Sequence, residues 1–356
     1  MKLWRIPENG SESPEARAAI TEAGELLGTG GIVAFPTETV YGLGCDAANT
    51  EAVERVFAAK GRPSDNPLIV HIADERQLEP IVKPYSGTAA KLMAAFWPGP
   101  LTIVLPALEG AVSPRVTAGL DTVAVRMPAH ETALKLIAAA GCPIAAPSAN
   151  RSGRPSPTRA EHVQEDLESR IDGLVDGGPA AVGLESTVVE VSEGCIRILR
   201  PGSVTAEELA AAGGCEVVEQ DEGAAGERSG QPEAPRSPGM KYTHYAPAGS
   251  MTLVAGEPEA VSGYIMKEAA MAAAEGRRTG ILVYEEHAAA YEADAVLVLG
   301  SLGRPADAAR TLYDALRTFD KLGIEEIWAE ACPQEGIGAA LMNRLTKAAG
   351  GRLIQV

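Results

Sequence analysis

The chain has 356 residues, of which 46% are hydrophobic, a formal net charge of −17 at pH 7 and five cysteines. The acidic balance argues against strong direct nucleic-acid binding, because cationic groups that neutralise phosphates supply most of such affinity and neither half of the chain is basic. The sequence has no signal-like N-terminal run, no apolar stretch long enough for a membrane span and no CxxC pair, so we expect a cytoplasmic protein without disulfides or membrane contact.

The first part of the chain alternates predicted helices and strands. Ser13 and Pro14 predict a helix N-terminus, and Gly28 is expected to end that helix. Periodic apolar positions predict further helices, at 50–60, 131–140 and 161–169. Short apolar runs predict strands at 32–35, 68–72, 101–105, 122–126, 143–146, 186–191 and 196–199. Thr205 and Glu208 predict the capping box of a last helix. Some strands follow each other directly, which indicates an α/β fold that is not purely parallel.

A change of composition divides the chain. Residues 219–236 are rich in Glu, Gly, Ala, Ser and Pro without an apolar period, which is typical of a linker. Beyond it, strands are predicted at 251–254, 280–284, 295–299, 326–329 and 352–356, separated by helices at 257–275, 305–321 and 337–349. We therefore expect three regions: a catalytic domain at 1–217, a linker at 218–247 and a smaller Rossmann-like α/β domain at 248–356. No GxGxxG follows the first strand of the last domain, so dinucleotide binding is not predicted.

Several loops that follow predicted strands are dense in small polar residues and cations. Their sequences are PTETVYGLG (36–44), KGRPSDNPLIVH (60–71), AVRMP (124–128), PSANRSG (147–153), ESTVV (185–189) and LRPG (199–202). In open α/β folds, ligands bind where such loops converge beyond strand ends. A single loop of this kind is usually only a turn, so the prediction of a binding site depends on the set.

Together and in this order, these segments resemble the YrdC-like family. SPGMKYTHYAP (237–247) and GIGAALMNRL (336–345) are similar to segments of the long, two-domain threonylcarbamoyl-AMP synthases of that family. The resemblance covers nearly the whole chain. It implies a YrdC-like twisted mixed-sheet domain followed by the Rossmann-like domain.

The resemblance implies ATP binding, although the chain has no Walker-type GxxxxGK[ST] loop. The triphosphate and its Mg²⁺ must then meet side chains, and Lys60, Arg62 and Arg200 are the expected donors, with Lys60 and Arg62 catalytic. The alternative for Lys60 and Arg62 is a cationic helix C-terminus that interacts with the helix dipole. The remaining predicted ATP contacts are Asn66, Thr122, Ser148, Asn150 and Ser156, each of which could instead be an ordinary turn residue.

The resemblance also implies a threonine pocket. Arg126 stands at the end of a predicted strand, where its guanidinium can bind a carboxylate in a bidentate way. By resemblance, Thr39, His71, Ala146 and Ser186 line the same pocket. From the sequence alone His71 is better interpreted as a core histidine, because it interrupts an apolar run.

The reaction that the family implies has two stages. The threonine amine and carbon dioxide from bicarbonate form a carbamate, whose oxygen attacks the α-phosphorus of ATP, and pyrophosphate leaves with Mg²⁺. In the family, the adenylate passes to a tRNA-modifying transferase complex that acts on an adenosine beside the anticodon. Two alternatives remain open: a carbamoyl-adenylate enzyme with another acceptor, and an RNA-binding module.

The segment 237–247 allows two interpretations. Met240, Lys241 and Tyr242 could belong to a lid that excludes water from the carbamate and adenylate. Alternatively, the aromatic and cationic side chains of the segment could dock the linker onto the second domain.

Overall fold

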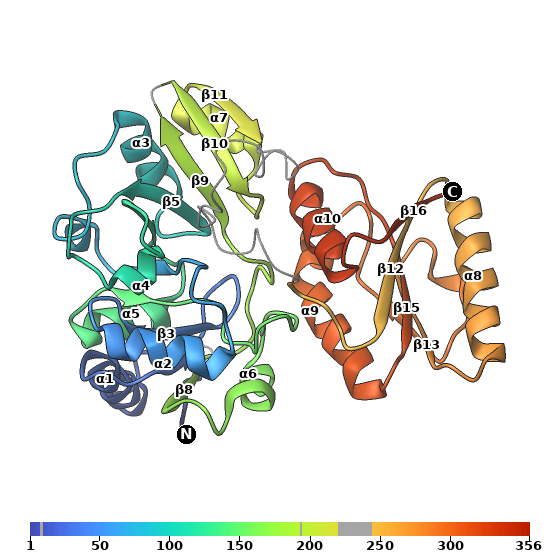
Figure 1. The fold of residues 1–356 in the computed structure, drawn as a ribbon, viewed down its shortest axis with the longest axis horizontal. Helices are drawn as coiled ribbons and strands as arrows, with labels where there is room; N and C mark the ends of the chain where they lie inside the picture. Colours follow the sequence, from blue (N-terminus) through green and yellow to red (C-terminus); the bar gives the residue numbers. More distant parts are fainter. Residues whose placement is uncertain (8–9, 193, 220–243) are drawn as a thin grey trace. The chain divides into compact units, whose positions relative to one another are not determined.

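The computed structural model describes residues 1–7, 10–192, 194–219 and 244–356, and the chain forms two compact units (Figure 1). The first unit comprises Met1–Ser152, Pro157–Ala181 and Glu185–Lys241. The second comprises Gly153–Ser156, Val182–Leu184 and Tyr242–Val356.

The first unit is built on a mixed sheet in the order β1-β8-β2-β3-β7-β4-β6-β5-β9-β10-β11. Its strands are β1 (Lys2–Arg5), β2 (Val33–Phe35), β3 (Gly42–Asp46), β4 (Ile69–His71), β5 (Leu101–Pro106), β6 (Thr122–Arg126), β7 (Ile144–Ala145), β8 (Gly173–Asp176), β9 (Thr187–Ser192), β10 (Cys195–Arg200) and β11 (Glu216–Glu219). Parallel pairs such as β4 with β6 stand beside antiparallel pairs such as β5 with β6. The predicted mixed-sheet α/β class is therefore confirmed.

Helices surround this sheet in the order α1 (Pro14–Gly28), α2 (Thr50–Lys60), α3 (Gly87–Phe96), α4 (Pro114–Thr117), α5 (Glu131–Ala140), α6 (Ala160–Leu167) and α7 (Ala206–Gly213). The predicted caps at Ser13 and at Thr205 with Glu208 are confirmed. The prediction that Gly28 ends α1 is confirmed, because Gly28 is the last residue of the helix and Thr29 is its C-cap. Gly28 also permits close packing on α5, since a Cβ there would lie 2.6 Å from the carbonyl oxygen of Ala140.

Some elements of the first unit were not predicted, namely β1, β3, β8, β11, α3 and α4. The sequence of β3, GLGCD, has too many glycines to read as a strand. The strand needs them because its neighbours are close: a Cβ at Gly44 would lie 2.8 Å from side-chain atoms of both Ile144 and Phe35.

The second unit has a five-stranded sheet in the order β14-β13-β15-β12-β16, with parallel pairing throughout its described strands. Its strands are β12 (Ser250–Ala255), β13 (Thr279–Val283), β14 (Ala295–Val298), β15 (Glu326–Glu330) and β16 (Leu353–Gln355), and its helices are α8 (Pro258–Ala274), α9 (Pro305–Leu322) and α10 (Ile337–Ala348). Val261 and Ile265 of α8 pack into a core with Ile281, Val283 and Trp328 of the sheet. This alternation confirms the predicted Rossmann-like arrangement. Among the helices of the described residues, none combines the length and the apolar character that crossing a membrane requires.

Candidate active site

The parallel pair β4 and β6 brings two predicted residues together at its carboxyl end. His71 ends β4, Arg126 ends β6, and the register of the sheet pairs them directly. Ala146 follows the antiparallel neighbour β7, and its backbone N–H donates at 2.9 Å to the carbonyl of Ile69, which begins β4. Two of the predicted threonine contacts, Arg126 and His71, thus lie side by side at one end of this strand pair, and Ala146 lies level with Ile69, two positions before His71 on β4.

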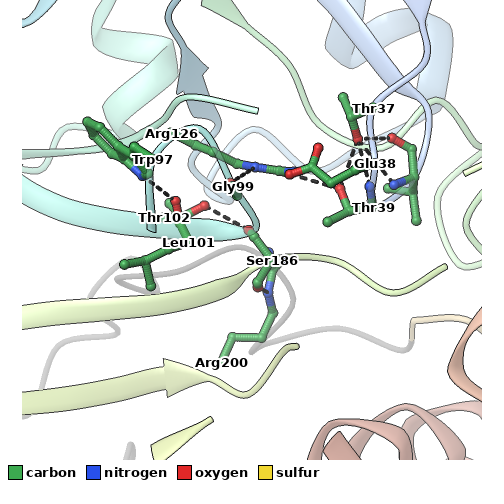
Figure 2. Close-up of polar contacts among 11 residues, drawn as sticks. Thr37, Glu38, Thr39, Trp97, Gly99, Leu101, Thr102, Arg126, Ser186 and Arg200 are labelled. Carbon is green, nitrogen blue, oxygen red and sulfur yellow. Dashed lines mark hydrogen bonds and ion pairs between the residues drawn. The ribbon is translucent and has the colours of Figure 1, made fainter. Parts of the chain in front are cut away.

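Arg126 is fixed by groups from two loops (Figure 2). Its Nη1 donates to Oγ1 of Thr39 at 2.9 Å and its Nε to the carbonyl of Gly99 at 3.2 Å. Its Nη2 lies 2.6 Å from Oε1 of Glu38, and the two side chains are only 4% and 8% exposed. Thr39 and Arg126, two of the residues predicted to bind threonine, are therefore in direct contact.

Sequence reasoning missed Glu38. The signal was available: an acidic residue stands between two threonines in a loop directly after the buried strand β2. The side chain of Thr37 fixes this loop, because its Oγ1 accepts the backbone N–H groups of Thr39 and Val40 at 3.2 Å each. Glu38 and Thr39 are consequently presented to Arg126 by a rigid turn.

His71 lies in an apolar environment. It is 5% exposed, its Nδ1 is 3.2 Å from the carbonyl oxygen of Ile69, and its ring meets the ring of Phe35 edge-on at 6.2 Å. Burial, and then the charge of Arg126, lowers the pKa of His71 to about 3. The imidazole is therefore neutral at physiological pH and can take part only as a hydrogen-bonding group.

Ser186 and Arg200 form a second polar cluster (Figure 2). Oγ of Ser186 is 2.7 Å from Oγ1 of Thr102 on β5 and accepts from Nη2 of Arg200 at 3.1 Å. Nε and Nη2 of Arg200 also donate to the carbonyl of Ser186, at 3.1 and 3.0 Å. The loop that precedes β9 and the end of β10 thus hold a buried cation beside a buried hydroxyl.

Lys60 joins the predicted nucleotide residues Ser148 and Asn150. It is the last residue of α2 and 3% exposed, and its Nζ donates to the carbonyls of Ser148 and Asn150, at 2.6 Å for Asn150. Oγ of Ser148 donates to Oδ1 of Asn150 at 2.5 Å. The ammonium group therefore bonds a neighbouring loop, so an interaction with the dipole of its own helix is not its whole role.

Asn66 is the most informative of the remaining predicted residues. Its side chain is buried, with a residue exposure of 1%, and among the described residues neither its amide nitrogen nor its amide oxygen has a hydrogen-bond partner. An unsatisfied buried amide is costly, so these atoms are candidates for contact with a ligand. Arg62 lies close by, and its Nη2 donates to the carbonyl of Pro67 at 3.1 Å.

Two predicted ATP contacts are not joined to Arg126. Thr122 begins β6, so it lies roughly 13 Å along the strand from Arg126. Extending the pairing of Ile69 with Ala124 places Thr122 beside Pro67, next to Asn66. Ser156 is fully buried and belongs to the second unit.

The described residues contain no group of three or more His, Cys, Asp or Glu side chains that could hold a metal ion. Cations and hydroxyls dominate the site instead. Such a donor set suits phosphates and carboxylates rather than a resident metal.

The segment 237–247 is described only from His244 onward, so Met240, Lys241 and Tyr242 lie outside the described residues. Tyr245 is 5% exposed and has a left-handed φ of 66°. Its ring lies 5.3 Å from the ring of Tyr313, and the guanidinium of Arg344 lies over it at 5.6 Å. Arg344 comes from the segment GIGAALMNRL, so two segments that the sequence singled out meet within the second unit.

Comparisons with known proteins agree with this geometry. Residues 25–202 match the Sua5/YciO/YrdC family model, described as telomere recombination, and residues 204–350 match the model of the threonylcarbamoyl-AMP synthase C-terminal domain. The chain is 52% identical to the threonylcarbamoyl-AMP synthase of Bacillus subtilis and 46% identical to that of Pyrococcus abyssi, covering 94% and 95% of these relatives and 94% of itself in both cases. It also resembles the crystal structure of P. abyssi Sua5 complexed with L-threonine, with a TM-score of 0.90, 44% identity and full coverage of both chains.

Proposed function

Because the chain belongs to the threonylcarbamoyl-AMP synthase family, it is a nucleotidyltransferase, and we propose that it converts L-threonine, bicarbonate and ATP into threonylcarbamoyl-AMP and pyrophosphate. The catalytic residues lie in the region 1–217, and the region 248–356 forms the second domain. The product serves the formation of N6-threonylcarbamoyl-adenosine in tRNA.

The observation that carries the proposal is Arg126. It is a buried cation at the end of a strand, with Thr39 on one side and His71 paired with it across the sheet. In the proposed complex its guanidinium binds the threonine carboxylate, and Thr39, His71, Ala146 and Ser186 line the pocket. A buried guanidinium suits this task, because its planar donors match a carboxylate.

In the proposed mechanism, the ATP phosphates meet Lys60, Arg62 and Arg200. Asn66, Thr122, Ser148, Asn150 and Ser156 are the proposed further contacts to ATP. A carbamate oxygen of the substrate attacks the α-phosphorus, and pyrophosphate leaves with the Mg²⁺ that ATP carries into the site. The protein contributes position and positive charge, which suffices for phosphoryl chemistry of this kind.

The proposed partner that receives the adenylate is a tRNA-modifying transferase complex. An acyl adenylate is an activated carbonyl compound, so its natural reaction is transfer to an amine such as N6 of adenosine. We place this step in the cytoplasm, which fits five cysteines that are all free thiols.

The proposal is tested by pyrophosphate release from ATP, leaving out threonine or bicarbonate in turn. We expect release only when both are present, together with an adenylate that carries the mass of threonine and carbon dioxide. Release at the same rate without an amino acid would point to another acceptor and overturn the assignment.

A further inference from the structure

Glu38 is a buried carboxyl group in a site that is rich in cations. It is 7% exposed and lies beside Arg126, in the same unit as Lys60 and Arg200. The proposed substrates bring negative charge: the phosphates of ATP, bicarbonate and the threonine carboxylate. A buried carboxylate repels all of these groups, so its presence needs a reason other than binding them.

Glu38 also has unused acceptor capacity. Apart from the ion pair with Arg126, neither of its carboxylate oxygens has a hydrogen-bond partner among the described residues. An ionised carboxylate can accept about four hydrogen bonds, and buried acceptors are rarely left without them. The two oxygens therefore point to a donor that arrives with the substrate.

The nearby imidazole of His130 does not fill this role. His130 is the N-cap residue of α5, and the charge of Glu38 acts on it, yet burial keeps its pKa below the ordinary value. Its Nδ1 also has no hydrogen-bond partner among the described residues. Among the residues that the structure describes, the cation paired with Glu38 is thus the guanidinium of Arg126.

The amino group of threonine is the donor that fits. In an α-amino acid the ammonium and the carboxylate are attached to one carbon atom, and the site places a carboxylate and a guanidinium 2.6 Å apart. We propose that Glu38 binds the amino group of threonine while Arg126 binds its carboxylate, so that the pair selects α-amino acids over other hydroxy acids. This inference rests on the proposed binding of threonine at Arg126.

The turn that carries Glu38 supports this role. The side chain of Thr37, which precedes Glu38, accepts the N–H groups of Thr39 and Val40, which follow it, so the turn that carries the carboxylate is ordered before the substrate arrives. A preorganised acceptor binds its ligand without a further loss of conformational entropy. When the amine becomes a carbamate it keeps one N–H, so Glu38 can hold the same nitrogen through the reaction.

The test compares two ligands on two forms of the protein. L-Threonine and (R)-3-hydroxybutyrate, which is threonine without its amino group, are titrated calorimetrically into the wild-type protein and into Glu38→Gln. We expect the wild-type protein to prefer threonine by about 10- to 100-fold, the range for a hydrogen bond to a charged group. In Glu38→Gln the preference should shrink to about threefold or less, because the neutral amide keeps an acceptor oxygen but offers the ammonium no negative charge.

The ratio of the affinities for threonine and 3-hydroxybutyrate distinguishes a binding role of Glu38 from a structural role. If Glu38 only holds Arg126 in place, Glu38→Gln lowers the affinity for both ligands by the same factor. The preference for threonine then stays the same, and the inference is wrong. Glu54→Gln is the matched control, because Glu54 pairs with Arg115 on the surface of the same unit and should leave the preference unchanged. Melting temperatures of all forms show whether they are folded.

If Glu38→Gln does not fold, Glu38→Asp replaces it. The shorter aspartate side chain keeps the negative charge but places it further from the ligand. The affinity for threonine should therefore fall several-fold, and the affinity for 3-hydroxybutyrate should stay nearly unchanged. Equal weakening of both ligands contradicts the proposal here too. A wild-type protein that binds no threonine and releases no threonine-dependent pyrophosphate overturns the proposed function itself, which is a different result.

Discussion

Both units bury arginines, but they do so in different places. In the first unit, Arg126 and Arg200 end the strands β6 and β10 and are 4% and 5% exposed. In the second unit, Arg317 and Arg344 lie within the helices α9 and α10 and are 1% and 0% exposed. Arg317 donates to the carbonyl of Pro155 at 2.6 Å, and Arg344 lies over the ring of Tyr245.

The difference shows that burial of a charge does not by itself mark a ligand site. The helical arginines bind a backbone carbonyl or an aromatic ring of their own unit, whereas Arg126 ends a strand beside Glu38, whose carboxylate oxygens have no hydrogen-bond partner among the described residues. The second unit does have a cavity of about 300 Å³ at the carboxyl ends of β12 and β15, lined in part by His287 and Glu330. Among the described residues, its lining contains no Lys or Arg, in contrast to the surroundings of Ser186 and Ser148 in the first unit.

The largest effect should come from Arg126. Arg126→Ala removes one partner of a buried charge contact, so threonine binding should weaken by about 2–5 kcal/mol, while ATP affinity should change far less. Calorimetric titration of each substrate measures both values. Normal threonine affinity in the variant would assign Arg126 to the scaffold, like the arginines of the second unit.

Arg344→Ala tests the other side of the comparison. The ring of Tyr245 would lose a buried cation and Tyr245 would lose support for its left-handed backbone, so the free energy of unfolding should fall by about 2 kcal/mol. Thermal unfolding measures this, and the threonine dissociation constant should stay unchanged. If threonine binding is lost instead, with stability intact, the contrast between the two units fails.

Substrate choice sharpens the contrast, because a ligand site discriminates and a structural cluster does not. Serine lacks one methyl group of threonine, and such a group is worth about 1–3 kcal/mol in an apolar pocket. Pyrophosphate release with serine should therefore be roughly 10- to 200-fold less efficient than with threonine. Equal efficiency would mean that no apolar wall contacts the methyl group.

Within one pH unit below 6.5, the smallest of these effects concerns His71. Its folded pKa is lowered to about 3, so between pH 6.5 and 3 the unfolded chain binds a proton that the folded chain does not. The contribution of neutral His71 to the free energy of unfolding is complete above pH 6.5. As the pH falls below 6.5 it is lost by about 1.4 kcal/mol per pH unit. Denaturant unfolding of the wild-type protein and His71→Gln should show a shallower pH slope for the variant. Parallel slopes would show that His71 is protonated in the folded protein.

Much of the local secondary structure could be predicted from the sequence. The predicted helices at 50–60 and 131–140 coincide with α2 and α5, and the capping residues Ser13 and Thr205 act as expected. These features depend on residues one to four positions apart, where periodicity and hydrogen bonding to neighbouring backbone leave a clear pattern. The polar loops were likewise visible, because cations and glycines follow short apolar runs.

Only the tertiary structure decided which of these loops meet. Arg126 contacts Thr39 across 87 positions of sequence, and Lys60 reaches Asn150 across 90, separations that no local pattern encodes. Sheet register put Thr122 level with Pro67 and His71 level with Arg126, pairings that the prediction of each strand alone does not give. The same folding brought the unpredicted Glu38 against Arg126. The sequence by itself determined where polar groups stand along each strand, and strand order and register, set by packing of the whole core, determined which of them share a site.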